Sequence, residues 1–161
     1  MNPVERVKQA LAASGLDVNL VRELPADTST AEAAARAVNA PQGSIVKSLI
    51  FLADGEPLLV LGAGDQRADV KRLRATLGLS KRRLRIARPP EVLEQTGFEV
   101  GGVPPVGHER PLRTLIDRSL SRFGTVWAAA GNAHAVFPIA YEQLVSITQG
   151  QVMDLVVTGN E

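Results

Sequence analysis

Residues 43–52 read GSIVKSLIFL, and this run predicts a β-strand more strongly than any other part of the chain. Turn-forming sequences flank it, Pro41-Gln42-Gly43 on one side and Ala53-Asp54-Gly55 on the other. Side chains of a strand alternate between two faces, so Ile45, Leu49 and Phe51 share one face and Val46, Ile50 and Leu52 the other. Because both faces are apolar, we expect this strand at the centre of a sheet that is covered on both sides.

Lys47 interrupts the apolar pattern, on the same face as Ile45 and Leu49. An ammonium group at such a position must reach water, pair with an anion or line a pocket. The strand alone leaves two interpretations open. Either Lys47 lies near a strand end and its head group is in solvent, or it lies at the floor of a pocket, where it can hold a ligand carbonyl or phosphate.

Apolar spacing and end signals predict the other elements on both sides of this strand. Helices are expected over residues 3–14, 69–77, 91–96 and 141–148, and a further helix follows a capping box at residues 29–32 and runs to Val38. Residues 58–61 return as the hairpin partner of the central strand, and residues 18–24, 113–120, 125–130 and 152–157 are further strand candidates. A closing segment begins at residues 136–139.

Length and composition restrict the function classes. A chain of 161 residues is most simply one domain, residues 1–161, with 45% hydrophobic and 22% charged residues. The absence of cysteine excludes thiol catalysis and disulfides, and the two histidines make a multi-histidine metal centre unexpected, so we predict no metal and no cofactor. No apolar run reaches the length of a membrane span, and the N-terminus lacks a signal-peptide core, so a cytoplasmic location is expected by default.

Basic residues are concentrated in one segment, although the net charge is only +1. Residues 67–88 contain nine of the 18 lysines and arginines and a single acid, Asp69. Such a cluster exceeds what solubility requires, so we favour polyanion binding over a merely solvated face. The residues expected to contact phosphates are Lys71, Arg72, Arg74, Arg82 and Arg83.

The stretch at residues 99–107, EVGGVPPVG, combines adjacent glycines with adjacent prolines. Glycine permits positive φ and a close approach of the backbone to a ligand, whereas proline fixes φ and removes a donor. A simple turn needs one such residue. The density found here predicts a stiff, shaped loop whose amides face a bound group.

The ordered set of these motifs resembles the YbaK family, the free-standing relatives of the editing domain inserted in bacterial prolyl-tRNA synthetases. The residues that carry the resemblance are SIVKSLIF at 44–51, GDQRAD at 64–69, Pro90-Glu91-Val92, Thr96-Gly97, GGVPPVG at 101–107, Ile116-Asp117 and Ala130-Gly131-Asn132. The resemblance covers nearly the whole chain, from about the capping box to the C-terminus. Its most specific part is the strand lysine followed by the GxxxP pattern at residues 101–105.

This resemblance implies a compact α/β fold, with a mixed, largely antiparallel, barrel-like sheet surrounded by helices. It also implies hydrolysis of the ester that joins a wrong amino acid to the 3′ end of tRNA, often tRNA for proline. Lys47 matches the functionally required lysine of the family, and Gly101 and Pro105 match the loop that shapes the aminoacyl pocket. The remaining candidates for substrate contact are Ser48, Gly102, Val103, Asp117, Gly131, Asn132 and His134.

Several of these candidates also have a structural interpretation. A lone aspartate in a strand usually caps or pairs, so a structural role is favoured for Asp117 over that of a catalytic carboxylate. The same holds for His134, which falls near where some family members carry a pocket histidine, and His108 is expected at the surface. Ester hydrolysis needs a positioned water and stabilisation of an oxyanion, and no serine–histidine constellation is evident.

Three functions remain open at this stage. The first is a deacylase that acts in trans on mischarged tRNA, namely tRNA that carries a small non-cognate amino acid such as alanine. The second is a non-catalytic module that docks tRNA or an aminoacyl-tRNA synthetase. The third, a pocket for a free metabolite, is disfavoured by the basic segment. Lys47 and the intact GxxxP loop favour the first, because a docking module needs neither.

Overall fold

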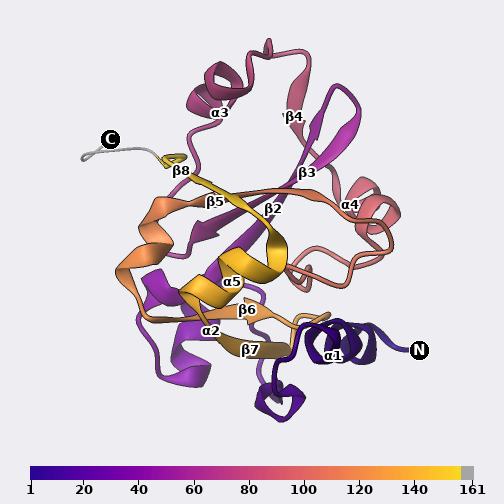
Figure 1. Ribbon diagram of the computed structural model, residues 1–161, viewed down its shortest axis with the longest axis vertical. Coiled ribbons are helices and arrows are strands. Elements are labelled where there is room, and N and C mark those ends of the chain that lie inside the picture. The colour runs from indigo at the N-terminus through magenta and orange to yellow at the C-terminus, as the bar shows by residue number, and fades with distance from the viewer. Residues whose placement is uncertain (157–161) are drawn as a thin grey trace.

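The strand predicted around Lys47 is the second strand of a five-stranded sheet. In the computed structural model, which describes residues 1–156, it is β2 (Val46–Ala53), and β3 (Glu56–Ala63) returns antiparallel to it (Figure 1). The turn between them uses Asp54 and Gly55 with φ of 53° and 81°, values that suit a tight hairpin. β2 is therefore a central strand, as its two apolar faces predict.

The five-stranded sheet is mixed. Its strand order is β4-β2-β3-β5-β8, where β4 is Leu84–Ile86, β5 is Arg113–Asp117 and β8 is Gln151–Met153. β4 pairs antiparallel with β2, whereas β5 is parallel to β3 and β8 is parallel to β5. A second, antiparallel sheet has the order β1-β7-β6, with β1 at Arg22–Glu23, β6 at Thr125–Ala129 and β7 at Ala135–Ala140.

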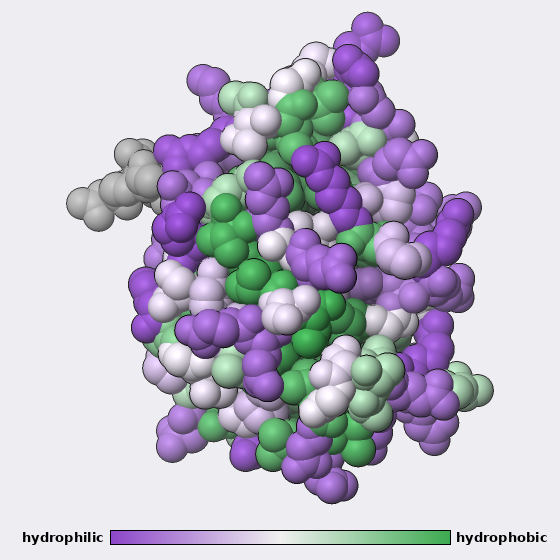
Figure 2. All heavy atoms as spheres, viewed as in Figure 1, coloured by the Kyte–Doolittle hydropathy of each residue, from purple (hydrophilic) through white to green (hydrophobic). Residues whose placement is uncertain are grey.

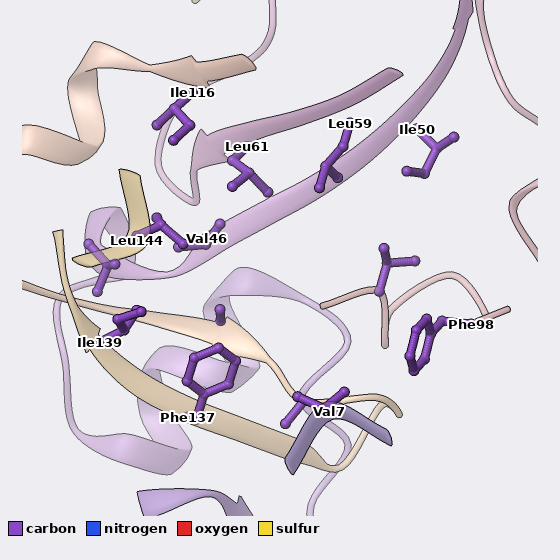
Figure 3. Packing of buried hydrophobic residues seen from close by; sticks show 14 of the residues in the cluster. Val7, Val46, Ile50, Leu59, Leu61, Phe98, Ile116, Phe137, Ile139 and Leu144 are labelled. Carbon is purple, nitrogen blue, oxygen red and sulfur yellow. The ribbon is translucent and has the colours of Figure 1, made fainter. Parts of the chain in front are cut away.

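The expected mixed α/β fold is confirmed, but the sheet is not closed into a barrel. The sheets are joined by an isolated bridge between Ile45 and Trp127. Apolar side chains fill the space between the sheets instead of continued backbone pairing. Figure 3 shows Leu59, Leu61 and Ile116 of the larger sheet facing Phe137 and Ile139 of the smaller one.

Five α-helices surround the sheets within the described residues, and all five were predicted. They are α1 (Pro3–Ala13), α2 (Ala31–Val38), α3 (Val70–Leu77), α4 (Pro89–Thr96) and α5 (Tyr141–Thr148). Asp69 caps α3, and Gly78 and Gly97 end α3 and α4 in the left-handed conformation. The predicted capping box at residues 29–32 is wrong in register, because Thr30 is the N-cap and accepts a hydrogen bond from the Ala33 amide.

Both faces of the larger sheet are covered. On one face Val46, Ile50 and Leu52 join the core between the sheets, which also receives side chains from α1, α4 and α5. On the other face Phe51 packs with Leu73 of α3 in a second cluster. A third cluster joins Ala34, Ala35 and Val38 of α2 to Ile45 and Val136, so the alanine face of α2 lies close to the strands.

Three strand predictions need correction. Residues 18–24 form a short 3-10 helix, Val18–Leu20, before the two-residue strand β1. The strand at residues 113–120 ends at Asp117 and continues as the 3-10 helix Arg118–Arg122. β8 starts at Gln151 and ends at Met153, and Val157 of the predicted strand lies outside the described residues.

No helix within residues 1–156 combines the length and the apolar character needed to cross a membrane. Figure 2 shows hydrophilic side chains around the outline of the molecule, with apolar ones in a broken band across this face.

Candidate active site

We call residues 99–107 the glycine–proline loop. A cavity of about 190 Å³ lies where this loop meets β2, β6 and α2. Its walls come from segments that are far apart in the sequence, and they include Lys47 and Ser48 of β2 with Gly101 and Val103 of the loop. The remaining lining residues are Thr28, Ser29, Thr30, Ala31, Ala34, Ile45, Val46, Leu49, Val100, Trp127, Ala128, Ala129 and Val136. The structure therefore brings four of the predicted site residues together at one hollow.

Lys47 is the one charged side chain in this lining, as far as the described residues go. Its ammonium donates a hydrogen bond to the carbonyl oxygen of Gln66 at 2.5 Å. Partial burial lowers the pKa of Lys47 from its ordinary value, and the nearby carboxylate of Asp65 opposes that shift. Since an ammonium has three donors, two remain for water or a ligand at the cavity.

Asp65 pairs with an arginine, and it forms no salt bridge with Lys47 within residues 1–156. The Asp65 carboxylate accepts two hydrogen bonds from the Arg122 guanidinium, at 2.6 and 3.0 Å. These bonds lower the pKa of Asp65. Because Asp65 pairs with Arg122, its charge raises the pKa of Lys47 without a direct ion pair between the two side chains.

Ser48 presents the most unusual polar atom of the cavity. Its Oγ is buried and has no hydrogen-bond partner within residues 1–156. Ser48 also lines a second recess of about 160 Å³, which shares Leu49, Val100 and Val103 with the first cavity. The other walls of this recess are apolar, namely Ile50, Ile86, Ala87, Pro89 and Val92. The two hollows are therefore adjacent. We refer to the first as the polar lobe, because it contains Lys47, and to the second as the apolar lobe.

Glycines let the loop lie close to its neighbours. Gly101 has φ of +90°, and a Cβ at this position would lie 2.9 Å from the Ser29 Cβ. A Cβ on Gly102 would lie 2.5 Å from the Cα of Asn132, and the Gly131 amide donates to the Gly102 carbonyl at 3.0 Å. Gly102, Gly131 and Asn132 therefore meet behind the loop, against the start of α1, and not in the cavity.

Three further candidates do not line the cavity. Pro105 faces another hollow, together with His108. Asp117 is buried and accepts hydrogen bonds from the Leu155 amide at 2.6 Å and from the Ser119 amide at 2.8 Å. His134 is exposed, and its Nδ1 lies 3.0 Å from the Ala26 carbonyl. Asp117 and His134 thus both contact the backbone of the fold and line no part of the cavity that contains Lys47.

His108 was expected at the surface, and that expectation is wrong. Its ring packs edge-on against Phe98, with 6.3 Å between ring centroids, and its Nε2 lies 2.7 Å from the Pro104 carbonyl. Burial lowers the pKa of His108, while the contact with Pro104 acts in the opposite direction. Sequence reasoning missed this position because Phe98 and Pro104 approach it only in the folded loop.

The basic segment lies mainly on α3 and on the chain that leads to β4, at the upper end of the molecule in Figure 1. Acids from other parts of the chain partly neutralise it, because Arg83 pairs with Asp54, and Arg85 and Arg88 pair with Glu91. These bonds hold the pKa of Glu91 at about 2. Among the described residues the basic side chains of this segment without an ion pair are Arg67, Lys71, Arg72, Arg74, Lys81 and Arg82.

Within residues 1–156 no group of three histidine, cysteine, aspartate or glutamate residues is placed to hold a metal ion. The fold and the site together define a small mixed α/β protein with a lysine-bearing cavity between two sheets.

Comparison with known proteins gives the family. Residues 25–147 match the family model of the aminoacyl-tRNA editing domain, so the chain belongs to this family. It is 36% identical over 135 residues to the uncharacterized protein YwhH of Bacillus subtilis, and the match covers 83% of this chain and 84% of YwhH. A proline–tRNA ligase of Oleidesulfovibrio alaskensis is 32% identical over 106 residues, which are 66% of this chain but only 18% of the ligase.

A solved structure extends the comparison to the fold. A protein described as a candidate trans-editing enzyme for prolyl tRNA synthetase is 42% identical to this chain and superposes with a TM-score of 0.90. The match covers 98% of this chain and 99% of that protein. The expected kinship with free-standing editing domains is therefore confirmed.

Sequence reasoning missed one wall of the cavity. Thr28, Ser29 and Thr30 line it at the start of α2, and Trp127 lines it from β6. The capping residues ahead of α2 were a local signal for a helix start, but not for a cavity wall. Trp127 is the single tryptophan of the chain and lies under the Arg22 guanidinium at 4.8 Å, which no local pattern indicates.

Proposed function

We propose that this protein hydrolyses the ester bond between an amino acid and the terminal ribose of tRNA, and that Lys47 is its catalytic residue. One observation carries the proposal: in a member of the aminoacyl-tRNA editing family, the cavity has Lys47 as the only charged side chain of its described lining. When water adds to an ester carbonyl, negative charge develops on the oxygen, and a positioned ammonium stabilises it. Lys47 has donors left for that purpose.

The described lining also restricts the route of the proton. It contains no carboxylate and no imidazole, and Lys47 is assigned to the oxyanion as an ammonium, so no further side chain of this lining is left to act as a general base. The attacking water therefore passes its proton to solvent, or through the free hydroxyl of the terminal ribose as a relay, in which the hydroxyl gives up its own proton as it accepts one. The ester oxygen of the ribose takes up a proton as the bond to the carbonyl carbon breaks.

The two lobes suggest how the substrate lies. The polar lobe, with Lys47 and with Ser29 in its lining, suits the ribose and the ester. The recess behind Ser48 is apolar and small, which suits a short aliphatic side chain such as that of alanine. An apolar pocket discriminates by only about 1–3 kcal/mol per methylene, so neighbouring aliphatic amino acids are expected to react at graded rates.

The rest of the tRNA would lie along the basic segment. Arg67 follows Gln66, whose carbonyl holds Lys47, so the segment begins beside the cavity and continues into α3. Phosphates of the acceptor end are natural partners for such a series of cations. The tRNA for proline is the first candidate, because relatives with matching sequence are prolyl-tRNA synthetases.

A deacylation assay tests this proposal. Purified protein is incubated with tRNA charged with alanine, serine, cysteine or proline, and the remaining ester is followed with time. We expect loss of alanyl ester well above the rate of spontaneous hydrolysis and little loss of prolyl ester. If no charged tRNA loses its ester faster than in buffer while tRNA still binds, the chain is a docking module and not an enzyme.

A further inference from the structure

His108 follows the glycine–proline loop directly and contacts it from behind. Its Nε2 lies 2.7 Å from the carbonyl oxygen of Pro104. A carbonyl only accepts hydrogen bonds, so Nε2 carries the proton and donates it. The contact fixes the middle of a loop whose other residues, Gly101 and Val103, line the cavity that contains Lys47.

A second set of contacts fixes the beginning of the same loop. The Arg6 guanidinium stacks on the Phe98 ring at 4.5 Å and donates to the Gly97 carbonyl at 2.5 Å. It also approaches Glu109, with 3.7 Å between nitrogen and oxygen. His108 also packs against Phe98, with an interplanar angle of 85° between the two rings. Residues 97–109 are thus held at both ends against α1, and Phe98 contacts both Arg6 and His108.

The loop benefits from such contacts because three of its glycines restrict the backbone little. Gly97, Gly101 and Gly107 have φ of +80°, +90° and +93°. Glycine populates both signs of φ readily, so these three positions are hinges unless neighbouring groups hold them. The prolines stiffen the middle of the loop but do not anchor it to the rest of the molecule.

We infer that His108 is a positioning residue for the deacylation site: its neutral imidazole holds Pro104 and Phe98, and thereby keeps Gly101 and Val103 in place beside Lys47. This inference rests on the proposed function for its effect on rate. It assigns to His108 no contact with the substrate, because His108 lines a different hollow from that of Lys47.

Protonation is expected to loosen this arrangement. A second proton would enter at Nδ1 and place a cation in a partly buried site. Burial and the Pro104 contact act on the pKa of His108, and no charged group is among its causes. Glu109, the next residue in the chain, pairs with Arg6, and the hollow that His108 lines has no charged side chain in its described lining. Burial is therefore the main cause that lowers the pKa of His108 below its ordinary value of 6.5.

The sign of the pH effect follows from this shift. When the loop is held by the contact between His108 and Pro104, His108 takes up the second proton less readily than when this contact is broken. In the released loop, the pKa of His108 would return to its ordinary value of 6.5. Falling pH therefore favours release, starting near the ordinary pKa and reaching its full extent below the lowered one. The reaction should become slower in acid by more than the general decline of ester hydrolysis.

Two variants test the inference. His108→Gln keeps an amide donor for Pro104 but cannot titrate, whereas His108→Ala removes the donor. Single-turnover hydrolysis of mischarged tRNA is measured from about pH 5 to about pH 8, the range in which histidine titrates, beside a thermal melt of each variant. We expect His108→Ala to lower the rate of the folded protein roughly three- to ten-fold, the range expected for one lost hydrogen bond. We expect His108→Gln to restore most of the rate and to lack the additional acid decline.

A purely structural histidine would give another result. Both variants would melt earlier, but the folded fraction would react at the wild-type rate with an unchanged pH profile, and this outcome overturns the inference. A further readout does not depend on activity: in nuclear magnetic resonance spectra the amides of Gly101, Gly102 and Val103 should shift together with the His108 ring as it titrates, and not in His108→Gln. If these amides follow His108 but no charged tRNA is hydrolysed, the proposed function fails and the contact with the loop stands. If they do not respond, the inference fails alone.

Discussion

Lys47 occupies a strand position at which an apolar side chain would suit the surroundings better. Ile45 and Leu49 flank it on the same face, and partial burial already lowers its pKa. A lowered lysine pKa means that the folded protein binds this proton less tightly than the unfolded chain does. The resulting penalty is present below the folded-state pKa and is relieved only as pH rises through that value towards 10.5. Lys47 is therefore not explained by stability.

The substitution Lys47→Met keeps most of the stem and removes the charge. We expect a melting temperature equal to or above that of the wild type, since the penalty on the buried charge is removed. Deacylation should fall roughly ten- to hundred-fold, because a charge-assisted contact is worth about 1.5–3 kcal/mol. Lys47→Arg should recover only part of the rate, because the guanidinium is larger and planar.

Single-turnover hydrolysis and thermal melts of the same preparations measure both effects. Lys8→Met, on α1 and outside the cavity, is the matched control and should react like the wild type. A folded Lys47→Met protein with the wild-type rate would contradict the assignment of the catalytic residue.

Removal of the Ser48 hydroxyl is expected to affect stability and activity in opposite directions. Its buried Oγ has no partner among the described residues, and an unsatisfied buried hydroxyl costs about 1–3 kcal/mol. Ser48→Ala should therefore leave the free energy of unfolding unchanged or raise it, yet slow deacylation if the hydroxyl contacts the substrate. Ser44→Ala is the control, because the Ser44 hydroxyl donates to the Pro41 carbonyl at 2.7 Å and its loss should destabilise by about 0.5–1.5 kcal/mol.

Chemical denaturation and single-turnover kinetics distinguish the two serines. A Ser48→Ala protein that loses stability as Ser44→Ala does would mean that its hydroxyl is bonded in the folded protein. A wild-type rate in a stabilised Ser48→Ala protein would leave the hydroxyl without a role in the reaction.

At the scale of elements, the packing of the glycine–proline loop on residues 131–133 supports the cavity wall. A Cβ at Gly102 would lie 2.5 Å from the Asn132 Cα and 2.8 Å from its amide nitrogen, so backbone must move. Gly102→Ala is expected to cost about 1–3 kcal/mol, as overpacking does elsewhere, and to impair deacylation because Gly101 and Val103 move with it. Gly124→Ala is the control, since a Cβ there meets no atom within 4 Å.

Denaturant unfolding measures the first effect and the deacylation rate of the folded protein the second. Equal behaviour of the two alanine variants would show that the loop tolerates displacement and does not support the site.

The sequence predicted the elements that local patterns specify. β2 has alternating apolar faces and flanking turns, and α3 has an N-cap aspartate and a C-terminal glycine, so both were found within two or three residues of their bounds. β4 was not predicted as a strand, because Leu84–Ile86 carries Arg85 and is extended only through pairing with Phe51–Ala53. The bounds of β1 were missed for the same reason, since its partner β7 lies more than a hundred residues further along the chain.

At the scale of the whole molecule, the cavity depends on how distant segments meet. The sequence singled out Lys47, Ser48, Gly101 and Val103 because each breaks a local pattern or carries the family resemblance. It could not place Thr28–Thr30 or Trp127 beside them, because those contacts follow from the way α2 and β6 approach β2. It also grouped Gly102, Gly131 and Asn132 with the pocket, whereas they meet behind the loop.

The basic segment provides the last prediction, because it acts over the length of the molecule. Arg72 and Arg74 lie on α3 without an ion pair among residues 1–156, whereas Arg83 is committed to Asp54. If each of the two arginines contacts a phosphate, the double variant Arg72→Glu and Arg74→Glu should bind tRNA with a weaker salt dependence. The slope of log affinity against log salt concentration should be smaller by about two. This variant should raise KM more than it lowers kcat, because Lys47 and the loop are unchanged.

The double variant Arg110→Glu and Arg113→Glu makes the same change in net charge outside the segment and is the control. Equal salt slopes for wild type and both double variants, measured by titration of labelled tRNA, would remove α3 from the tRNA-binding surface.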